Sequence, residues 1–386
     1  MEIIKGLNII IIAVLLISCS KEENNVKYTP IEVKSISDEV HANSFFEMDT
    51  FLRLSNTALL GRIEKIIISD SLIYVLDNIP KLVCFDSSGR VKFNINKTGK
   101  GPDEFLKLID FSVDPIHKSL VLLDERQMKV LFFNSENGKF IKNAGIKFYP
   151  NNIKMVQDEL YFYNPYTNVR DNKYHYSLIM TSLDNSNIER KWIKHDDINR
   201  LYFTFTKHHF FTGDEGTYFI NRMDNKIYEL SENNLKLKYQ ISGLDFFDMS
   251  NIDKSKKNIE VFDDIKKSDK FYSIQNFSEC SDYIYFTVHK KNRAYVVLYN
   301  KLKKEVEFCS SMLLTKPTKE LPLFTSDLMG IKNGKLFGII EPITIIGMKN
   351  HPKTPKLEIF SNSWSDLKVT DNPILVFYSV KNEKIK

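Results

Sequence analysis

Short apolar segments separated by polar turns recur along most of the chain. In the best-defined copy, residues 65–68, 72–77, 81–85 and 91–95 are apolar segments of strand length, and Asp, Ser and Gly stand between them. Segments of this length with such turn residues are typical of β-strands joined by hairpins. A stack of parallel βαβ units would need a helical segment of a dozen or more residues between strands, and none separates these copies. The pattern therefore predicts antiparallel sheets.

The same four-strand module is repeated, and its second strands end about 40 to 67 residues apart, close to the ~40–50 residues of a propeller blade. The excess length falls mainly in 243–270 and 344–373, and only 354–369 reads as a short helix. A four-stranded sheet has two faces to cover, and a ring of such sheets covers both. Residues 45–54 predict a strand that pairs with 374–380. We therefore predict an all-β, six-bladed β-propeller with four antiparallel strands per blade and an N-terminal strand closing the last blade; five or seven blades remain alternatives.

The first residues are expected to direct export. Lys5 precedes an apolar stretch of about 11 residues, too short for the ~20 that span a bilayer. The stretch ends in Leu16-Ile17-Ser18-Cys19, which resembles the lipobox of bacterial lipoproteins, although Ile17 departs from the usual small residue. A cleaved signal peptide without lipidation is the alternative. The expected organisation is a signal peptide over 1–18, a polar tether over 19–44, and a propeller domain over 45–386.

The resemblance to lipoproteins implies that Cys19 becomes the acylated N-terminus. Attached acyl chains, palmitate among them, would hold the protein on a membrane, because two or more chains anchor stably. Ser20-Lys21-Glu22-Glu23 resembles the export tag of Bacteroidetes surface lipoproteins. The expected location is therefore the cell envelope, as an outer-membrane lipoprotein displayed at the cell surface.

Composition changes this picture little. Lys+Arg 54 and Asp+Glu 49 leave a net charge of +5 that is spread along the chain, so no basic stripe predicts a nucleic-acid partner. The chain has 14 Gly but 33 Asn, and Asn accepts left-handed turn geometry. Besides Cys19 there are three cysteines: Cys84 is expected in the core, and whether Cys280 and Cys309 form a disulfide is left open.

Several motifs together resemble a known family. They are Tyr74-Val75-Leu76-Asp77, the turn from Phe85-Asp86 to Gly89, Gly99-Lys100-Gly101-Pro102-Asp103-Glu104-Phe105, Asp110-Phe111-Ser112-Val113-Asp114, and Asp371-Asn372-Pro373-Ile374-Leu375. The chain is similar to six-bladed β-propeller lipoproteins of Bacteroidetes, relatives of NHL-repeat propellers, over about 45–380. The resemblance implies the fold and the location but no common reaction.

Candidate chemistry is sparse. Gly99-Lys100-Gly101-Pro102 lacks the spacing of a phosphate-binding P-loop and is interpreted as a turn between blades. His208 and His209 are adjacent on an expected strand, so their side chains point to opposite faces and are interpreted as solvated or core residues. No metal site, cofactor or catalytic residue is predicted.

Polar residues near the ends of second strands are the candidate ligand-binding set, because equivalent positions in a ring can converge near the axial opening. Their first interpretation is turn stabilisation, with ligand binding as the alternative. The set comprises Asp77, Asp124, Arg126, Asn164, Arg170, Asn221, Arg222 and Arg293.

We therefore expect a lipid-anchored binding or interaction module whose ligand is a carbohydrate, a peptide or an envelope protein. A propeller enzyme of the lyase or lactonase type acting on a carbohydrate is the first alternative, and a structural subunit of an envelope complex is the second. Whether the protein is an enzyme stays open, with a non-catalytic role favoured.

Overall fold

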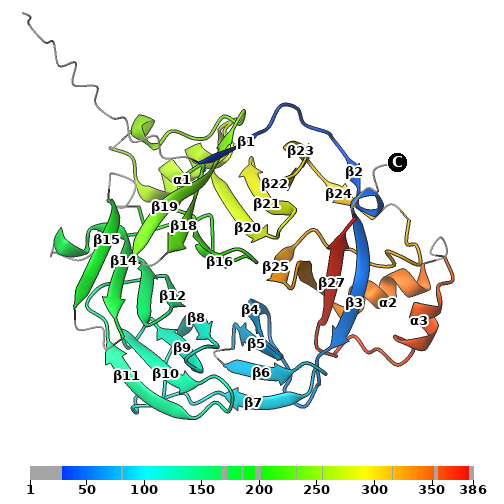
Figure 1. Cartoon of the computed structure of the whole chain (residues 1–386), viewed down its shortest axis with the longest axis horizontal. Coiled ribbons are helices and arrows are strands. Elements are labelled where there is room, and N and C mark those ends of the chain that lie inside the picture. The colour runs from blue at the N-terminus through cyan, green and yellow to red at the C-terminus, as the bar shows by residue number, and fades with distance from the viewer. Residues whose placement is uncertain are drawn as a thin grey trace, which may run out of the picture.

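Six blades, each built on four antiparallel strands, surround a common axis in the computed structural model (Figure 1). The structure describes residues 28–79, 81–166, 172–183, 187–195, 201–231, 233–253, 255–314, 316–351 and 355–381. From the innermost strand outward, the blades are β4 (Ile63–Ser69), β5 (Leu72–Asp77), β6 (Leu82–Asp86), β7 (Val91–Ile95); β8 (Leu108–Asp114), β9 (Ser119–Asp124), β10 (Lys129–Asn134), β11 (Phe140–Gly145); β12 (Asn152–Val156), β13 (Glu159–Tyr163), β14 (Tyr176–Ser182), β15 (Ile188–Lys194); β16 (Phe210–Thr212), β17 (Thr217–Phe219), β18 (Lys226–Ser231), β19 (Asn234–Ser242); β20 (Ser273–Glu279), β21 (Tyr283–Lys290), β22 (Arg293–Asn300), β23 (Glu305–Cys309); and β25 (Leu328–Lys332), β26 (Lys335–Ile340), β27 (Ile374–Val380), β3 (Phe46–Arg53). The predicted fold is confirmed, with six blades.

Burial along each blade explains its sequence pattern. Every residue of β5 and β9 is buried, because a middle strand is covered by a neighbouring blade on each face. The outer strand β7 instead alternates between partly buried and exposed positions, as expected where one face meets water. Side chains from facing blades form shared clusters, such as Tyr74 of the first blade with Phe111 and Leu122 of the second. The core is therefore a ring of layers between blades.

Left-handed turn positions are filled by Asn as often as by Gly. Asn233, Asn276, Asn292 and Asn333 have positive φ angles, as do four glycines. Glycine is required at Gly89, where φ is +78° and a Cβ atom would lie 2.2 Å from the carbonyl oxygen of Arg53. This turn therefore also fixes the distance between the first blade and β3.

The ring is closed by the N-terminal strand, as predicted. β3 pairs antiparallel with β27, from Arg53 opposite Ile374 to Phe46 opposite Val380. Next to this seam, the Asn372 side chain accepts a hydrogen bond from the Leu60 amide and donates to the carbonyl groups of Ser55 and Ala58. Segments some 310 residues apart in sequence are thus joined in one blade.

Residues 29–44, which the sequence analysis places in a polar tether, lie along the propeller instead. β1 (Thr29–Glu32) adds to blade four by pairing parallel with β19, and β2 (Val40–His41) pairs parallel with β24 (Met312–Leu313). Ile31 and Ala42 are fully buried. The apolar residues scattered through this polar stretch cover the outer edges of blades, and sequence polarity alone did not indicate that.

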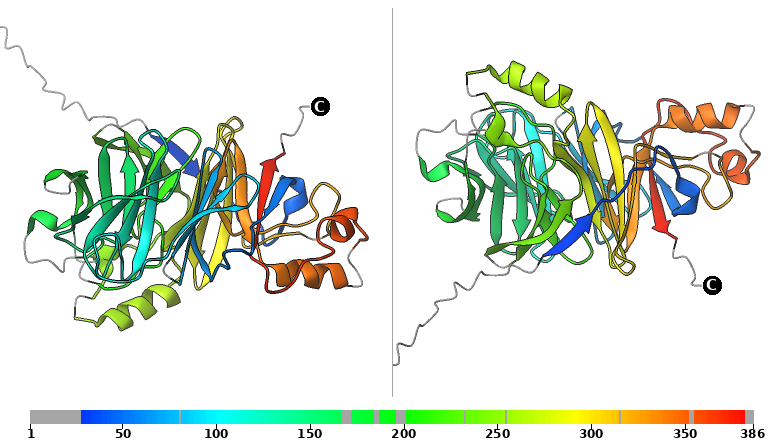
Figure 2. Two further views of the ribbon diagram at one scale, coloured as in Figure 1. Left: turned by 90° about the horizontal axis from the view of Figure 1, so that it is seen from below. Right: turned by 90° about the horizontal axis from the view of Figure 1, so that it is seen from above.

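Three α-helices lie in the two long insertions that the sequence predicts. α1 (Asn258–Lys267) buries Val261 and Ile265, one helical turn apart, whereas α2 (Pro342–Asn350) and α3 (Glu358–Asn362) lie between β26 and β27 (Figure 2). Only α3 falls in the expected helical stretch of 354–369. Short 3-10 helices occupy Ala42–Ser44, Asn172–Tyr174 and Met249–Asn251. None of the helices in the described part of the chain has the length and apolar character to cross a lipid bilayer.

The three cysteines of the propeller are free and buried, so Cys280 and Cys309 do not form a bridge. Cys84 lies in the core, as expected.

Candidate functional site

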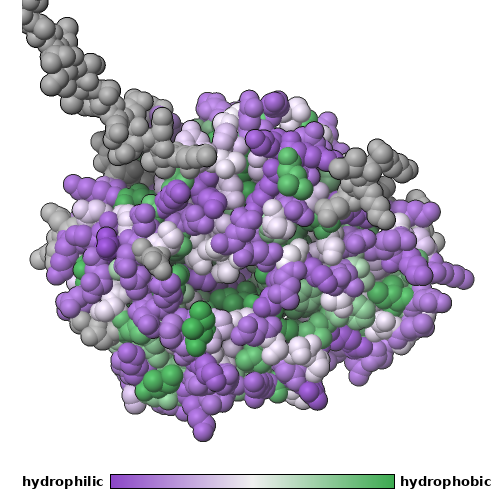
Figure 3. All heavy atoms as spheres, viewed as in Figure 1, coloured by the Kyte–Doolittle hydropathy of each residue, from purple (hydrophilic) through white to green (hydrophobic). Residues whose placement is uncertain are grey.

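A cavity of about 670 Å³ lies on the axis, and residues from all six inner strands line it. These strands run in one direction, so the hairpins that follow them share one face of the ring, here called the open face. Figure 1 views this face, and Figure 3 shows a hollow at its centre with hydrophobic residues inside. Figure 2 shows α1 on the opposite face.

The other end of the cavity is crossed by the connection between β15 and β16. The Lys207 ammonium forms an ion pair with Glu64, and the ring of His208 places Nε2 2.9 Å from the Glu64 carbonyl oxygen. Blades one and four face each other across a six-bladed ring, so this connection spans the axis. Asn152 of blade three donates to the Lys207 carbonyl group, and Gln275 of blade five donates to that of Phe205.

Helix α1 supports this crossing segment from outside. The rings of Phe205 and Phe262 stack with centroids 4.9 Å apart and nearly parallel planes. Leu201 and Val261 belong to the same buried cluster. The insertion that carries α1 therefore covers the crossing segment, and the cavity is a pocket that opens on the open face.

Two of the amines lining the cavity are neutralised by carboxylates. Lys65 Nζ lies 2.6 Å from Asp110 Oδ1 and also donates to the Phe111 carbonyl group. The second oxygen of Asp110 accepts the Ile153 amide at 2.9 Å, so this buried carboxylate links three blades. Lys207 is the other neutralised amine, through Glu64. These pairs are structural.

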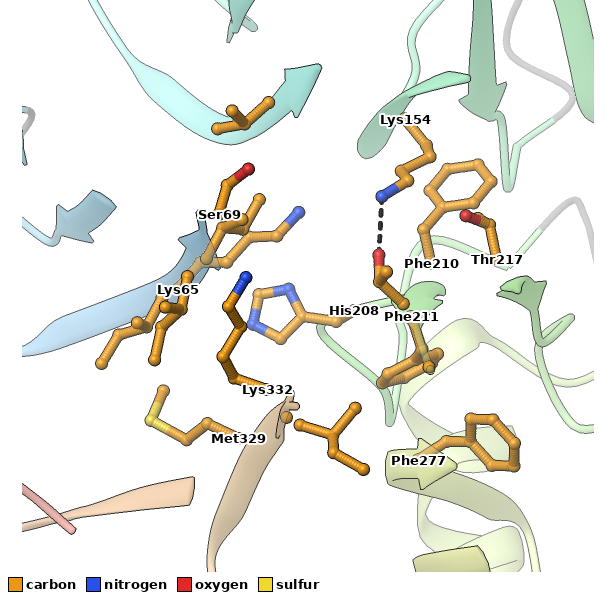
Figure 4. Close-up of a pocket in the computed structure, with 18 of the residues that line it drawn as sticks. Lys65, Ser69, Lys154, His208, Phe210, Phe211, Thr217, Phe277, Met329 and Lys332 are labelled. Atoms are coloured by element: carbon orange, nitrogen blue, oxygen red, sulfur yellow. Dashed lines mark hydrogen bonds between the residues drawn. The ribbon is translucent and has the colours of Figure 1, made fainter. Parts of the chain in front are cut away.

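Two further amines have no carboxylate partner among the described residues. Lys154 Nζ donates to Thr212 Oγ1 at 2.7 Å, and Lys332 makes no ion pair or side-chain hydrogen bond there. Burial and the neighbouring charge of Lys65 lower the pKa of Lys154 to about 8. Figure 4 shows Lys65, Lys154, Lys332 and His208 directed into the same space.

His208 contributes a neutral group. Burial, with the charge of Lys65 adding to it, lowers the pKa of the imidazole to about 4. Because Nε2 faces a carbonyl oxygen, it carries the proton, and Nδ1 is an acceptor. Nδ1 is buried and has no hydrogen-bond partner among the described residues. His208 therefore contributes an uncharged ring beside the amines.

Several aromatic side chains and one methionine are part of the wall. They are Phe210, Phe211, Phe277, Phe337 and Met329. Nearer the open face the lining includes Asp70, Asp114 and Asp214, of which Asp114 is held by His117 at 2.8 Å. Ammonium groups that form no ion pair among the described residues, in a cavity partly walled by aromatic rings, are suited to bind carboxylate, sulfate or phosphate groups.

The predicted ligand-binding set does not gather at this cavity. None of its described members lines the cavity, and Arg170 lies outside the described residues. Asp77 accepts the Gly61 amide, and Asp124 accepts the amides of Leu106 and Lys107. These are the turn contacts of the first interpretation.

The remaining members of the set are also spread out. Asn164 donates to the Tyr174 carbonyl group, and Arg126 and Arg293 are exposed. Asn221 and Arg222 line a second cavity of about 360 Å³, and the guanidinium of Arg222 donates to the carbonyl groups of Leu201, Phe203 and Pro165. Polar residues recur at equivalent strand ends, but the side chains of Asp77, Asp124 and Asn164 bond to nearby turns and loops.

The glycine-rich motif is an inter-blade turn, as interpreted. Glu104 accepts the Gly101 amide at 2.7 Å, and the Gly99 amide donates to the Phe105 carbonyl group. Of the histidine pair, His209 is buried against Tyr163, with ring centroids 3.7 Å apart.

Sequence analysis did not select Lys65, Lys154, Lys332 or His208 as a site. Lys65 and Lys154 are each the third residue of an inner strand, next to apolar neighbours. A lysine at the same place in two repeated modules was a usable signal, and aligning the modules by strand position finds it.

Comparisons with known proteins agree with the fold. The chain belongs to the family described as "Domain of unknown function (DUF4934)", whose model matches residues 30–379. A Bacteroides fragilis protein described as exported (BF0058) has a crystal structure with a TM-score of 0.77 and 20% identity, covering 92% of this chain and 100% of its own. A member of the DUF4221 family from Bacteroides vulgatus has a TM-score of 0.51 and 10% identity, covering 87% and 98%. None of the curated proteins matches.

Proposed function

We propose that this protein is a lipid-anchored binding module of the cell envelope that holds a small anionic ligand in its axial cavity. The observation that carries the proposal is the pair of amines, Lys154 and Lys332, that face one aromatic-walled pocket without a carboxylate partner among the described residues. An exported relative with the same fold supports the envelope location.

The anchor part of the proposal rests on the sequence. Cys19 and the tag Ser20-Lys21-Glu22-Glu23 lie outside the described residues, and the lipobox motif is the support for acylation. Display at the outer surface of the outer membrane follows from the tag. In this proposal, the ligand reaches the cavity from the surroundings of the cell.

The chemistry of the cavity narrows the ligand class. Carboxylates on sugars, such as uronic acids, combine an anionic group for the amines with a ring that can pack on the partly exposed Phe211. A volume of about 670 Å³ lies within the ~300–1,000 Å³ of small-molecule sites. The proposed ligands are therefore acidic sugars and other small organic anions.

Calorimetric titration with methyl glucuronide, galacturonate oligomers and a neutral methyl glucoside tests this proposal. We expect the acidic sugars to bind and the neutral one to bind at least tenfold more weakly. Lys154→Met and Lys332→Met should each weaken acidic-sugar binding about 10- to 100-fold, because a charge-assisted hydrogen bond contributes about 1.5–3 kcal/mol. Lys92→Met, on the exposed surface of β7, is the matched control.

Equal binding of acidic and neutral sugars, or equal loss in all three lysine variants, would contradict the proposal. Thermal melting of each variant separates loss of a contact from loss of the fold.

A further inference from the structure

We infer that Lys154 is a nucleophilic amine that forms an imine with a carbonyl group of the bound anion, so that the cavity is built for aldehyde or keto acids. This inference rests on the proposed function, because it uses the same cavity and names the ligand class more narrowly.

The position of the amine is fixed by its neighbours. Lys154 extends from β12, and its Nζ is held at 2.7 Å by the hydroxyl group of Thr212 on β16. A hydroxyl oxygen orients the amine without adding the negative charge that would favour the ammonium form. Lys65 shows the contrast, because its amine lies 2.6 Å from the Asp110 carboxylate.

The surroundings of Lys154 also favour the free amine. Burial lowers its pKa most and the positive charge of Lys65 adds to this effect, whereas the carboxylates of Asp110 and Asp114 oppose it. With the pKa lowered to about 8, about one Lys154 side chain in ten is uncharged at pH 7. For a lysine with the ordinary value of 10.5, the fraction is roughly one in three thousand. The nucleophilic form is therefore more abundant in Lys154 than in an ordinary lysine.

The other groups of the cavity suit the reaction. The Lys154 nitrogen uses its lone pair to form a bond with the carbonyl carbon, and the carbonyl oxygen takes up a proton. Loss of water then leaves a C=N bond, so no oxidant or reductant is consumed. His208 is neutral and adds no charge to this space. The anionic end of the ligand meets Lys332.

Reductive trapping provides the test. The purified protein is incubated at pH 7 with glyoxylate and sodium cyanoborohydride, which reduces any imine to a stable secondary amine, and modified lysines are identified by peptide mass mapping. We expect Lys154 to be modified at least tenfold faster than exposed Lys92. Propanal, an aldehyde without an anionic group, should modify Lys154 at least fivefold more slowly than glyoxylate, and Lys332→Met should remove that difference.

The controls separate this inference from the proposed function. Lys154→Arg keeps the positive charge but has no amine that can form an imine, so the trapped product should be lost. Modification of Lys154 at or below the rate of Lys92 overturns the inference, even if acidic sugars bind as proposed. Equal trapping with glyoxylate and propanal overturns the oxo-acid class. If every lysine variant still binds the acidic sugars and Lys154 is still trapped preferentially, the proposed function alone is overturned.

Discussion

At the scale of single residues, the same lysine position has two different roles in this propeller. Lys65 and Lys154 are both the third residue of an inner strand, but within the described part of the chain only Lys65 of the two forms an ion pair, with Asp110. Lys65 therefore joins blades through a buried ion pair, whereas Lys154 bonds to a hydroxyl group and keeps a lowered pKa of about 8. The residue that each lysine contacts, and not the lysine itself, therefore decides whether the lysine has a structural or a functional role.

This difference predicts a pH dependence for anion binding. Below pH 8, Lys154 is an ammonium group that attracts the ligand; above pH 8 it loses its proton, so affinity should fall. Burial lowers its pKa most, Lys65 adds to this shift, and Asp110 and Asp114 oppose it. His208 stays neutral from pH 6 to 9 because its own pKa is about 4. Titration of sulfate, whose charge is constant in this range, should show at least threefold weaker binding at pH 9 than at pH 6.5.

Lys154→Arg is the control for this measurement, because a guanidinium group stays charged throughout the range. It should bind sulfate equally at both pH values. A flat profile in the unmodified protein would show that Lys154 does not contact the anion.

At the scale of elements, the two N-terminal strands differ in what they hold together. β3 forms the outer strand of blade six and buries Phe46 completely, so it joins the two ends of the ring. β1 pairs through only four residues with the outer edge of blade four, which is already complete without it. Ring closure should therefore depend on β3 and not on β1.

Truncation of the mature chain tests this difference. Removing residues up to 34 should lower the melting temperature but preserve one cooperative transition. Removing residues up to 53 should abolish cooperative unfolding, because the open edge of β27 and the apolar sides of blades one and six become exposed to water. Similar melting curves for the two truncated chains would contradict the role given to β3.

At the scale of the whole molecule, strand directions relate the anchor to the cavity. β16 runs toward the open face, and β19 is antiparallel to it by three successive hairpin pairings. β1 runs parallel to β19, so Thr29 lies at the open face. Nine residues separate Cys19 from Thr29 and span at most about 30 Å when fully extended. An acylated Cys19 would therefore hold the open face toward the membrane.

Fluorescent labels in lipid vesicles can measure this orientation. A label at Asp158→Cys, on a hairpin of the open face, should be quenched more strongly by a quencher in the lipid than a label at Ile259→Cys on α1. The native propeller cysteines are buried and leave these labels specific. Equal quenching would contradict the orientation, and a Cys19→Ser variant that still fractionates with membranes would contradict the anchor.

The strands, their order and the closing seam could be predicted because each depends on local pattern. Middle strands such as residues 72–77 are continuously apolar, and turns carry Asn, Asp or Gly where the backbone needs them. The role of residues 29–44 could not be predicted, since Ile31 and Ala42 are buried by blades far away in sequence. Helix α1 was missed because only Val261 and Ile265 form its buried side.

For a related reason, the local sequence pattern could not predict the candidate site. Asp77 and Asp124 stand at equivalent strand ends, but their oxygens accept amides of nearby turns. Lys154 and Lys332 come from blades three and six. Nothing in the sequence places them in one cavity or shows that neither forms an ion pair among the described residues.

By itself, the sequence determined that this chain forms a ring of small β-sheets, because hydrophobic periodicity and turn chemistry act over a few residues at a time. Tertiary structure alone decided which polar groups face the axis and which are neutralised. That decision depends on contacts between blades, such as Asp110 with Lys65 and Thr212 with Lys154, which join residues about 45 to 58 positions apart.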